Sequence, residues 1–316
     1  MAKTKSDGVC KCFPGSNAIV PGKTGNTIAG NRVGYLGGGP LAYLGTPGLV
    51  GIVDVAGSGD TIGPRNVVDW NGDGVVLLNT FDASLVGGNS IGGGAVPSPE
   101  PNGNGVVLLG TQDTLVGGST TSAENLVGPF GEGGIWVESS TSQDAKLLGD
   151  LGLSGRNSSN TVISGNDVSS NHEMPDGVTP PQSTLIETIK AQGVNNVAIL
   201  SNSIYQNESG GILGGDQLPV PLVSNPLVNS GKLSVEVKVQ QKSGVTERIQ
   251  VFSNPSCSAA DKDEGQSYLG DAVFTGKSTG DANETVKVKG PGKDGGITAT
   301  LTEGATTSQF SECVPS

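Results

Sequence analysis

Short aliphatic runs separated by small polar residues make up most of this sequence. Val75–Leu78 and Val106–Leu109 are typical runs, and Gly, Asn, Asp or Ser stand at their ends. Runs of this length are too short to be stable alone, whereas the flanking residue types tolerate tight turns. The pattern therefore predicts short β-strands joined by corners.

These runs also recur at a regular interval. Gly74–Leu78, followed by Ser84–Gly88, returns 31 residues later as Gly105–Leu109, followed by Thr114–Gly118. A third copy begins at Gly134, 29 residues further along. A fixed period of this kind is typical of repeat proteins, whose units bury their apolar side chains only by stacking on one another.

The repeats predict an all-β stack of parallel strands. Aliphatic side chains are expected to form inward-facing columns, with Asn and Gly at the corners. No segment between residues 26 and 228 keeps an apolar period of 3.6 residues, which excludes helical repeats. Only Ser183–Ala191 has the composition of a short helix.

A different pattern begins near Ser230. Apolar and polar residues alternate there, as in strands that bury one face. Six or seven such strands predict a small antiparallel β-sandwich, which would cover the edge of the preceding strands. The alternating segments are Leu233–Val239, Glu247–Phe252, Ser267–Phe274, Glu284–Val288 and Gly296–Leu301.

Charge changes at the same place. The chain has 316 residues and a formal net charge of −12. Residues 1–229 contain 9 Lys and Arg against 19 Asp and Glu, and residues 230–316 contain 9 against 11. We therefore expect an extended leader at 1–25, the repeats at 26–229 and the sandwich at 230–316.

Several strings within residues 26–202 resemble a known class of repeat. NTIAGN, DTIGPRNVV, NGDGVVLL, NTVISGNDVSSN and NVAILSNSIYQNESGGI resemble the right-handed parallel β-helix repeats of secreted bacterial surface proteins, within the pectin-lyase-like superfamily. RIQVFSNPSC, EGQSYLGDAVF and ITATLTEGATTSQFSECV resemble an immunoglobulin-like module. The resemblance implies a right-handed parallel β-helix (solenoid) followed by a small β-sandwich. It does not fix an activity, because this scaffold hosts lyases, hydrolases, epimerases, phage tailspikes and adhesins.

Composition excludes two partner classes. The sequence pI is near 4.5 with only 18 Lys and Arg, whereas nucleic-acid binding relies on cationic side chains. An apolar run of about 20 residues, as a membrane span requires, does not occur. We expect neither nucleic acid nor a membrane span.

Four cysteines limit the redox and metal chemistry. They form neither a CxxC pair nor a Cys/His cluster, so a structural zinc site is not expected. Cys257 and Cys313 lie near the two ends of the C-terminal segment and could form a disulfide, with free buried thiols as the alternative. A disulfide would indicate an oxidising compartment. Cys10 and Cys12 are too close to bridge without strain, so they are candidates for pairing with another chain or for simple exposure.

Candidate catalytic groups are few. His172 is the only histidine and stands beside a Pro-rich loop, and Arg65 is the only cation between Arg32 and Lys146. An acidic surface of this kind repels polyuronates. Four aspartates precede aliphatic strands and fit either a carboxylate ladder, which could hold calcium or act as an acid/base pair, or ordinary turn chemistry. They are Asp60, Asp82, Asp113 and Asp144.

Carbohydrate contact is expected around Trp70. It lies beside Asp69 and close to Asp73, whereas Trp136 stands within an apolar strand and fits the core. Exposed aromatic side chains flanked by polar groups are the usual means of holding a sugar ring. Asn71–Gly74 resembles half of a calcium loop but lacks the distal Glu, so a tight turn is the expectation.

These features favour a non-catalytic extracellular protein, structural or adhesive, that forms part of a cell-surface or filamentous assembly. Its expected partners are further copies of itself, other cell-surface components or a polysaccharide. No cofactor is expected, with calcium as the one alternative. In one version, Met1–Lys23 acts as a donor strand for a neighbouring subunit.

An enzyme is the main alternative. A lyase or glycoside hydrolase would need an acid pair, and a carbohydrate-binding module without turnover lies between the two hypotheses. Candidates for the pair are Asp54, Asp60, Asp69, Asp73, Asp82 and Asp113.

Overall fold

The computed structural model describes residues 24–33, 48–68, 71–82, 85–92, 102–128, 130–140, 153–169, 187–192, 194–207, 210–214, 218–258, 263–291 and 295–316. All regular structure within these ranges is β-strand, which confirms the all-β prediction. None of the described segments is a helix long and apolar enough to cross a membrane.

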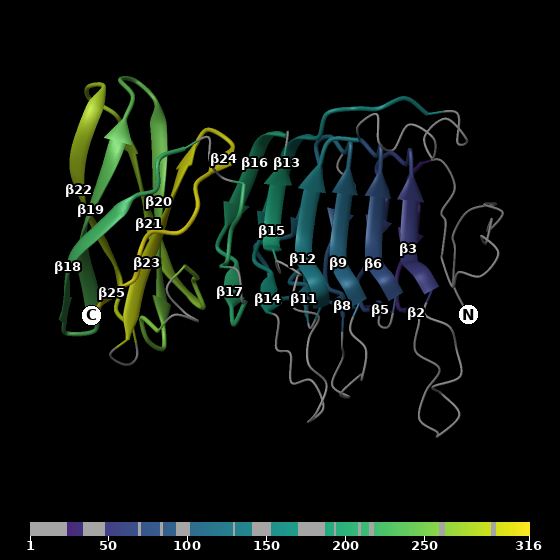
Figure 1. Cartoon of the computed structure of the whole chain (residues 1–316), viewed down its shortest axis with the longest axis horizontal. Coiled ribbons are helices and arrows are strands. Elements are labelled where there is room, and N and C mark those ends of the chain that lie inside the picture. Colours follow the sequence, from purple (N-terminus) through teal and green to yellow (C-terminus); the bar gives the residue numbers. More distant parts are fainter. Residues whose placement is uncertain are drawn as a thin grey trace.

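Three parallel sheets make up the first part of the molecule (Figure 1). The first contains β1 (Thr27–Ile28), β4 (Thr61–Ile62), β7 (Leu85–Val86), β10 (Leu115–Gly117), β13 (Ser159–Ser164) and β16 (Asn195–Leu200). The second contains β2 (Arg32–Val33), β5 (Val67–Val68), β8 (Ser90–Ile91), β11 (Leu126–Val127), β14 (Asp167–Ser169) and β17 (Ser203–Tyr205). The third contains β3 (Gly48–Val55), β6 (Asn71–Leu78), β9 (Asn102–Leu109), β12 (Phe130–Glu138) and β15 (Glu187–Gln192).

The chain enters the three sheets in rotation. β1, β2 and β3 each begin a sheet, and β4 then pairs in parallel with β1, β5 with β2 and β6 with β3. We call one passage through the three sheets a rung, and the series of rungs the parallel stack. Because successive rungs align in register, equivalent residues of the sequence repeats lie directly over one another.

Aliphatic columns fill the interior of the parallel stack. Ile52, Val75, Val106 and Ile135 occupy one register position in β3, β6, β9 and β12, and all four are fully buried. Burying an aliphatic side chain of this size contributes about 1.5–3 kcal/mol. Strands of two residues are stable here because their backbones pair with strands of the neighbouring rungs.

An asparagine column runs along the corner between the first two sheets. Within it, each Asn Nδ2 donates to the Oδ1 of the Asn in the next rung, at distances of 2.9–3.1 Å. The same amide groups also donate to backbone carbonyls, such as that of Ile62. The column therefore satisfies buried polar groups that the corner would leave unpaired. Its members are Asn31, Asn66, Asn89, Asn125, Asn166 and Asn202.

Two antiparallel sheets form the C-terminal part. One has the order β18 (Leu222–Asn229), β19 (Lys232–Gln241), β22 (Gly280–Lys289). The other has the order β21 (Ser267–Thr275), β20 (Thr246–Asn254), β23 (Gly296–Glu303), β24 (Thr306–Thr307), and β25 (Val314–Pro315) also pairs with β23. Alternate residues of β19 are buried against β20 and β23 in one apolar cluster.

The structure corrects three details of the sequence analysis. The antiparallel part already includes β18 and so begins at Leu222 rather than near Ser230; β18 is mostly exposed and lacks the alternation that marks the other strands. Within Ser183–Ala191, the segment that could have been a short helix, the described residues 187–191 lie in strand β15, because its backbone pairs with β12. Asn71–Gly74 is not a tight turn but the first half of β6.

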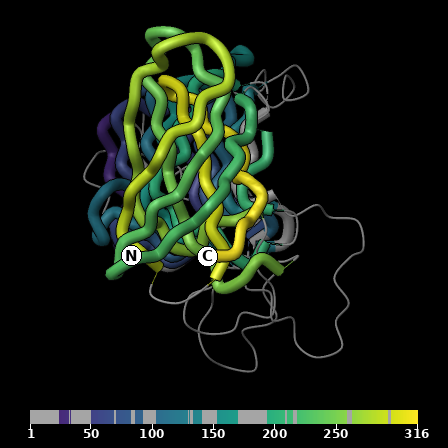
Figure 2. The backbone as a smooth tube through the Cα atoms, turned by 90° about the vertical axis from the view of Figure 1, so that its left-hand side faces the viewer, coloured from purple at the N-terminus to yellow at the C-terminus, as the bar shows by residue number. Residues whose placement is uncertain are grey.

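The C-terminal sheets cover one end of the parallel stack (Figure 1). Viewed from that end, their strands lie in front of the stack (Figure 2). The Ile199 N–H donates to Thr307 Oγ1 at 2.9 Å, and Gln250 Nε2 donates to the Ile199 carbonyl at 3.0 Å. Phe252 and Phe310 extend the apolar interior of the stack into the C-terminal part. Backbone groups of β16 and β17 therefore find partners in the C-terminal part, as the bridge between Ile204 and Gly265 also shows.

Candidate functional site

The proposed carbohydrate contact is only partly visible. Asp73 lies in β6, half-buried, and Asn104 Nδ2 of the next rung donates to its Oδ1 at 2.8 Å. Trp70 and Asp69 lie outside the described residues. The same is true of His172, Asp144, Cys10, Cys12 and Met1–Lys23.

Asp82 and Asp113 occupy an exposed corner between the third and first sheets. Their φ values are 59° and 54°, in the left-handed region that Asp and Asn tolerate better than most residues. Asn160, in the next rung, has a φ of 55°, and its Nδ2 donates to Asp113 Oδ1 at 3.1 Å. Asp82 and Asp113 therefore fit ordinary turn chemistry, one of the two interpretations of the aspartates that precede aliphatic strands.

Asp60 belongs to the same corner, between β3 and β4, but its side chain is buried in the interior beside Asp54. The two side chains are 1% and 0% exposed. In register, Asp54 occupies the place that Leu77 and Leu108 hold in the next two rungs. Asn26 donates to Asp60 Oδ1 from its backbone N at 2.6 Å and from Nδ2 at 2.9 Å. The first rungs thus contain a buried carboxyl pair within an otherwise aliphatic interior.

The buried pair has unusual electrostatics. Burial, then the charge of Asp60 and a hydrogen bond between the two carboxyls, together raise the pKa of Asp54 to about 8. At neutral pH Asp54 therefore keeps its proton. Gly57 closes over it, since a Cβ at that position would meet carboxylate oxygens of both residues. A pair enclosed in this way has no access to a polymeric substrate.

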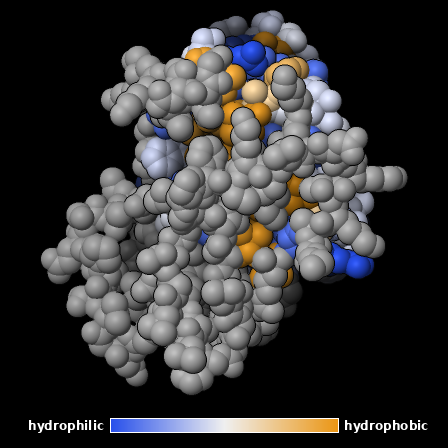
Figure 3. All heavy atoms as spheres, turned by 90° about the vertical axis from the view of Figure 1, so that its right-hand side faces the viewer, coloured by the Kyte–Doolittle hydropathy of each residue, from blue (hydrophilic) through white to orange (hydrophobic). Residues whose placement is uncertain are grey.

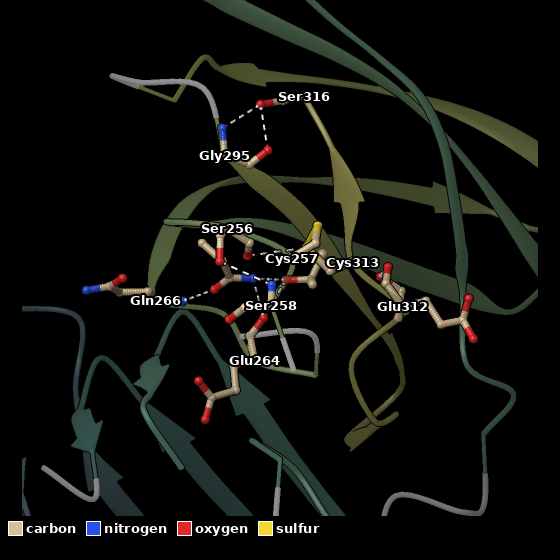
Figure 4. The surroundings of a disulfide bond; sticks show 12 residues. Ser256, Cys257, Ser258, Glu264, Gln266, Gly295, Glu312, Cys313 and Ser316 are labelled. Carbon is tan, nitrogen blue, oxygen red and sulfur yellow. Dashed lines mark hydrogen bonds between the residues drawn. A yellow bond between two sulfur atoms is a disulfide. The ribbon is translucent and has the colours of Figure 1, made fainter. Parts of the chain in front are cut away.

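Cys257 and Cys313 are joined by a disulfide, the pairing that the sequence analysis considered (Figure 4). Their Cα atoms lie 5.4 Å apart and they are 56 residues apart in sequence. The bond ties the segment after β20 to the segment before β25, directly beside Gly296, where any side chain would clash with Cys313 Sγ. Close by, Gly295 N donates to Ser316 Oγ at 3.1 Å and holds the last residue in place.

Two hollows lie outside the asparagine column. In most rungs this corner is short, but in one rung the segment Gly118–Glu124 projects from it. On one side of this segment is a hollow of about 630 Å³, lined by Arg65, Gly88 and Leu126 among others. On the other side is a hollow of about 560 Å³ at the junction with the C-terminal sheets. Both are lined by Thr121 and Glu124.

The junction hollow contains a fixed aromatic side chain. Tyr268 is 37% exposed, and its ring packs against Phe252 with centroids 5.6 Å apart. Its hydroxyl donates to Asp271 Oδ1 at 2.6 Å, and Arg248 Nη1 lies 3.2 Å from Asp271 Oδ2. Burial, followed by the hydrogen bond to Asp271, raises the pKa of Tyr268 to about 12, so the hydroxyl stays protonated. The sequence did not reveal the group of Tyr268, Asp271 and Arg248, because it meets the last rungs of the stack only in the folded structure.

Neither metal clusters nor relatives identify the site. Within the described ranges, no three His, Cys, Asp or Glu side chains are grouped so that they could hold a metal ion. No family model matches the chain, and no curated protein matches it either. Its function must therefore be argued from the geometry of its own residues.

Proposed function

We propose that this protein is a non-catalytic extracellular component, structural or adhesive, built on a right-handed parallel β-helix that ends in an immunoglobulin-like sandwich. The observation that carries the proposal is the continuous interior of the stack, in which the enclosed carboxyls of Asp54 and Asp60 are an exception to the aliphatic columns. The aliphatic columns and the asparagine column run from rung to rung and continue into Phe252 and Phe310 of the C-terminal part. Such a body is a stiff rod, suited to display or to assembly.

The carboxyl groups support a non-catalytic role over the enzymatic alternative. A glycosidase needs two carboxyls that face the sugar from an open site. Asp54 and Asp60 are enclosed, and Asp82 and Asp113 serve an exposed corner. The disulfide supports an extracellular location, since such bonds persist in oxidising compartments.

Assembly with further copies is part of the proposal. Among the described strands, β1, β2 and β3 each end a sheet on their outer side. Strand edges of this kind are templates for pairing with another chain. Apolar side chains of described residues are in view at the same end of the stack (Figure 3). Met1–Lys23 would supply a donor strand to a neighbouring subunit in the sharper version of this proposal.

Particle size in solution tests the assembly. Sedimentation velocity and electron microscopy would compare the full chain with a variant lacking residues 1–23, each with and without calcium. We expect concentration-dependent oligomers of the full chain that the deletion abolishes. Oligomers that persist unchanged would contradict the donor strand, and a monomer at all concentrations would contradict self-assembly. A calcium-dependent change would identify that ion as a partner.

Carbohydrate binding without turnover is the second candidate. The junction hollow favours it, because an exposed tyrosine stands there beside a paired arginine and carboxylate. Incubation with a panel of polysaccharides, assayed for new reducing ends and for unsaturated products, separates it from an enzyme. Product formation would contradict the non-catalytic proposal.

A further inference from the structure

We propose that the two hollows together form one elongated groove that binds a neutral oligosaccharide chain along the asparagine corner. This inference rests on the adhesive version of the proposed function and names its ligand class and site. The groove is defined by the linings of the two hollows, from Arg65 at one end to Tyr268 and Arg248 at the other.

The arrangement of the groove fits a linear polymer. Its lining comes from five successive rungs, represented by Arg65, Gly88, Glu124, Gly165 and Ser201, and then from the C-terminal sheets. At about 4.8 Å between neighbouring strands, these rungs span roughly 19 Å. A pyranose unit extends a chain by a length close to one such spacing, so successive sugars would meet successive rungs. Gly118–Glu124 would contact the chain near its middle.

Tyr268 supplies the means of holding one sugar ring. Aromatic faces bind the C–H surface of a pyranose, provided that the ring is exposed and does not need to be ordered first. Here Phe252 supports the ring and Asp271 fixes its hydroxyl, while part of the side chain faces the hollow. Leu126, 51% exposed, offers a second apolar surface in the other hollow.

The polar groups of the groove are suited to vicinal hydroxyls. Arg248 and Asp271 form an ion pair beside Tyr268, and Glu124 lies on the projecting segment that lines both hollows. Guanidinium and carboxylate groups can form two parallel hydrogen bonds with neighbouring hydroxyl groups. Hollows of about 560 and 630 Å³ lie within the range usual for ligand sites.

Charge decides between neutral and acidic glycans. The lining contains two cations, Arg65 and Arg248, and one carboxylate, Glu124. Arg248 is already neutralised by Asp271, which leaves Arg65 balanced by Glu124. No surplus of positive charge is available to bind a polyuronate, and the chain as a whole carries −12. A neutral chain is the ligand that this balance favours.

Titration calorimetry on the full chain tests the groove directly. The probes are cellohexaose, xylohexaose, mannohexaose and chitohexaose, with hexagalacturonate as the acidic comparison. We expect at least one neutral probe to bind, with affinity lowered about tenfold by Tyr268→Ala and severalfold by Leu126→Ser. Val273→Ser is the matched control, because Val273 lies on the same strand as Tyr268, is 54% exposed and does not line the groove.

Each outcome bears on one claim. Leu126→Ser changes an exposed side chain, so it stays informative even if thermal unfolding shows that Tyr268→Ala is destabilised. Binding that neither variant weakens, or no binding of any neutral probe, would overturn the groove while leaving the assembly measurements unaffected. Preference for hexagalacturonate would overturn the assignment of a neutral ligand. Cleavage of a bound probe would overturn the non-catalytic function and leave the groove in place.

Discussion

The parallel stack and the antiparallel C-terminal part reach stability by different routes. Strands β1, β4, β5, β7, β8 and β11 of the stack have two residues each, whereas β19 to β23 have eight to ten. In the stack, a side chain is stabilised by its equivalents in the rungs above and below. In the C-terminal part, β19 buries alternate residues in the apolar cluster between the two sheets, and a disulfide joins the segment after β20 to the segment before β25.

This difference predicts how far the effect of a substitution extends through the structure. A polar group in a stacked column has its hydrogen-bond partners in neighbouring rungs, so losing it leaves those rungs with buried unpaired groups. When a surface residue of the antiparallel sheets is replaced, water can form the hydrogen bonds that its former partners lose. Substitutions in the two parts should therefore differ in their effect on the free energy of unfolding.

The buried carboxyl pair should make the stack sensitive to alkali. The folded-state pKa of Asp54, about 8, lies above its unfolded value of 3.8. The folded chain therefore binds more protons between these two pH values, and stability falls as pH rises through the interval. From pH 4 to pH 8 we expect a loss on the order of 5 kcal/mol from this group alone.

Asp54→Asn should remove that dependence and stabilise the protein at pH 8, as urea denaturation at several pH values would show. Glu247 provides the comparison in the C-terminal part. Burial raises its pKa, but a hydrogen bond from the Lys242 N–H lowers it, while the charges of Glu303 and Glu284 raise it. Identical pH profiles for Asp54→Asn and the unmodified chain would contradict the raised pKa of Asp54.

Breaking the disulfide should destabilise the antiparallel part. A closed loop of 56 residues contributes about 4 kcal/mol through the lost entropy of the unfolded chain. The double variant Cys257→Ser with Cys313→Ser should therefore unfold at lower temperature in calorimetry. Because the C-terminal sheets cover the last rung, we expect the end of the stack to lose protection against hydrogen exchange as well. Protection that is lost only around Cys257 and Cys313 would show that the two parts are uncoupled.

The asparagine column should be far less tolerant than surface asparagines. Asn89 donates to the Ile62 and Gly87 carbonyls and to Asn125 Oδ1, and it accepts from Asn66. Asn89→Ala leaves several of these buried groups unpaired and should cost about 3 kcal/mol in denaturant unfolding. A loss below about 1 kcal/mol would show that water enters the corner.

Asn225→Ala is the matched change in the antiparallel sheets. Its Nδ2 donates to Glu236 Oε2 at 2.8 Å on an exposed surface. Water replaces such a bond readily, but Asn225 has a φ of 49°, which Ala tolerates less well than Asn, so the expected effect is about 1 kcal/mol. The same denaturation experiment measures it, and a loss equal to that of Asn89→Ala would remove the contrast between the two parts.

Local pattern was enough to predict much of the fold. The repeat period indicated parallel strands, and the alternation in Leu233–Val239 indicated an antiparallel sheet, because burial on one or two faces leaves a direct mark on residue order. The residue pattern did not predict strands β15 and β18. Their pairing partners, β12 and β19, determine their conformation more than their own residues do.

The candidate sites show the same limit. Cys257 and Cys313 could be paired on sequence grounds, since few cysteines leave few choices. The sequence also contained Asp54 and Asp60, but only the packing of the rungs shows that both side chains are buried side by side, which raises the pKa of Asp54.

By itself, the sequence determined the strand repeats, the acidic surface and the alternating C-terminal strands, because these depend on the order of residue types along the chain. Only the tertiary structure decided which carboxyls are buried, and only it created the hollows beside Gly118–Glu124 and the group around Tyr268. Those features depend on the distances between residues far apart in sequence, such as Ser201 and Arg248, and a one-dimensional pattern does not contain such distances.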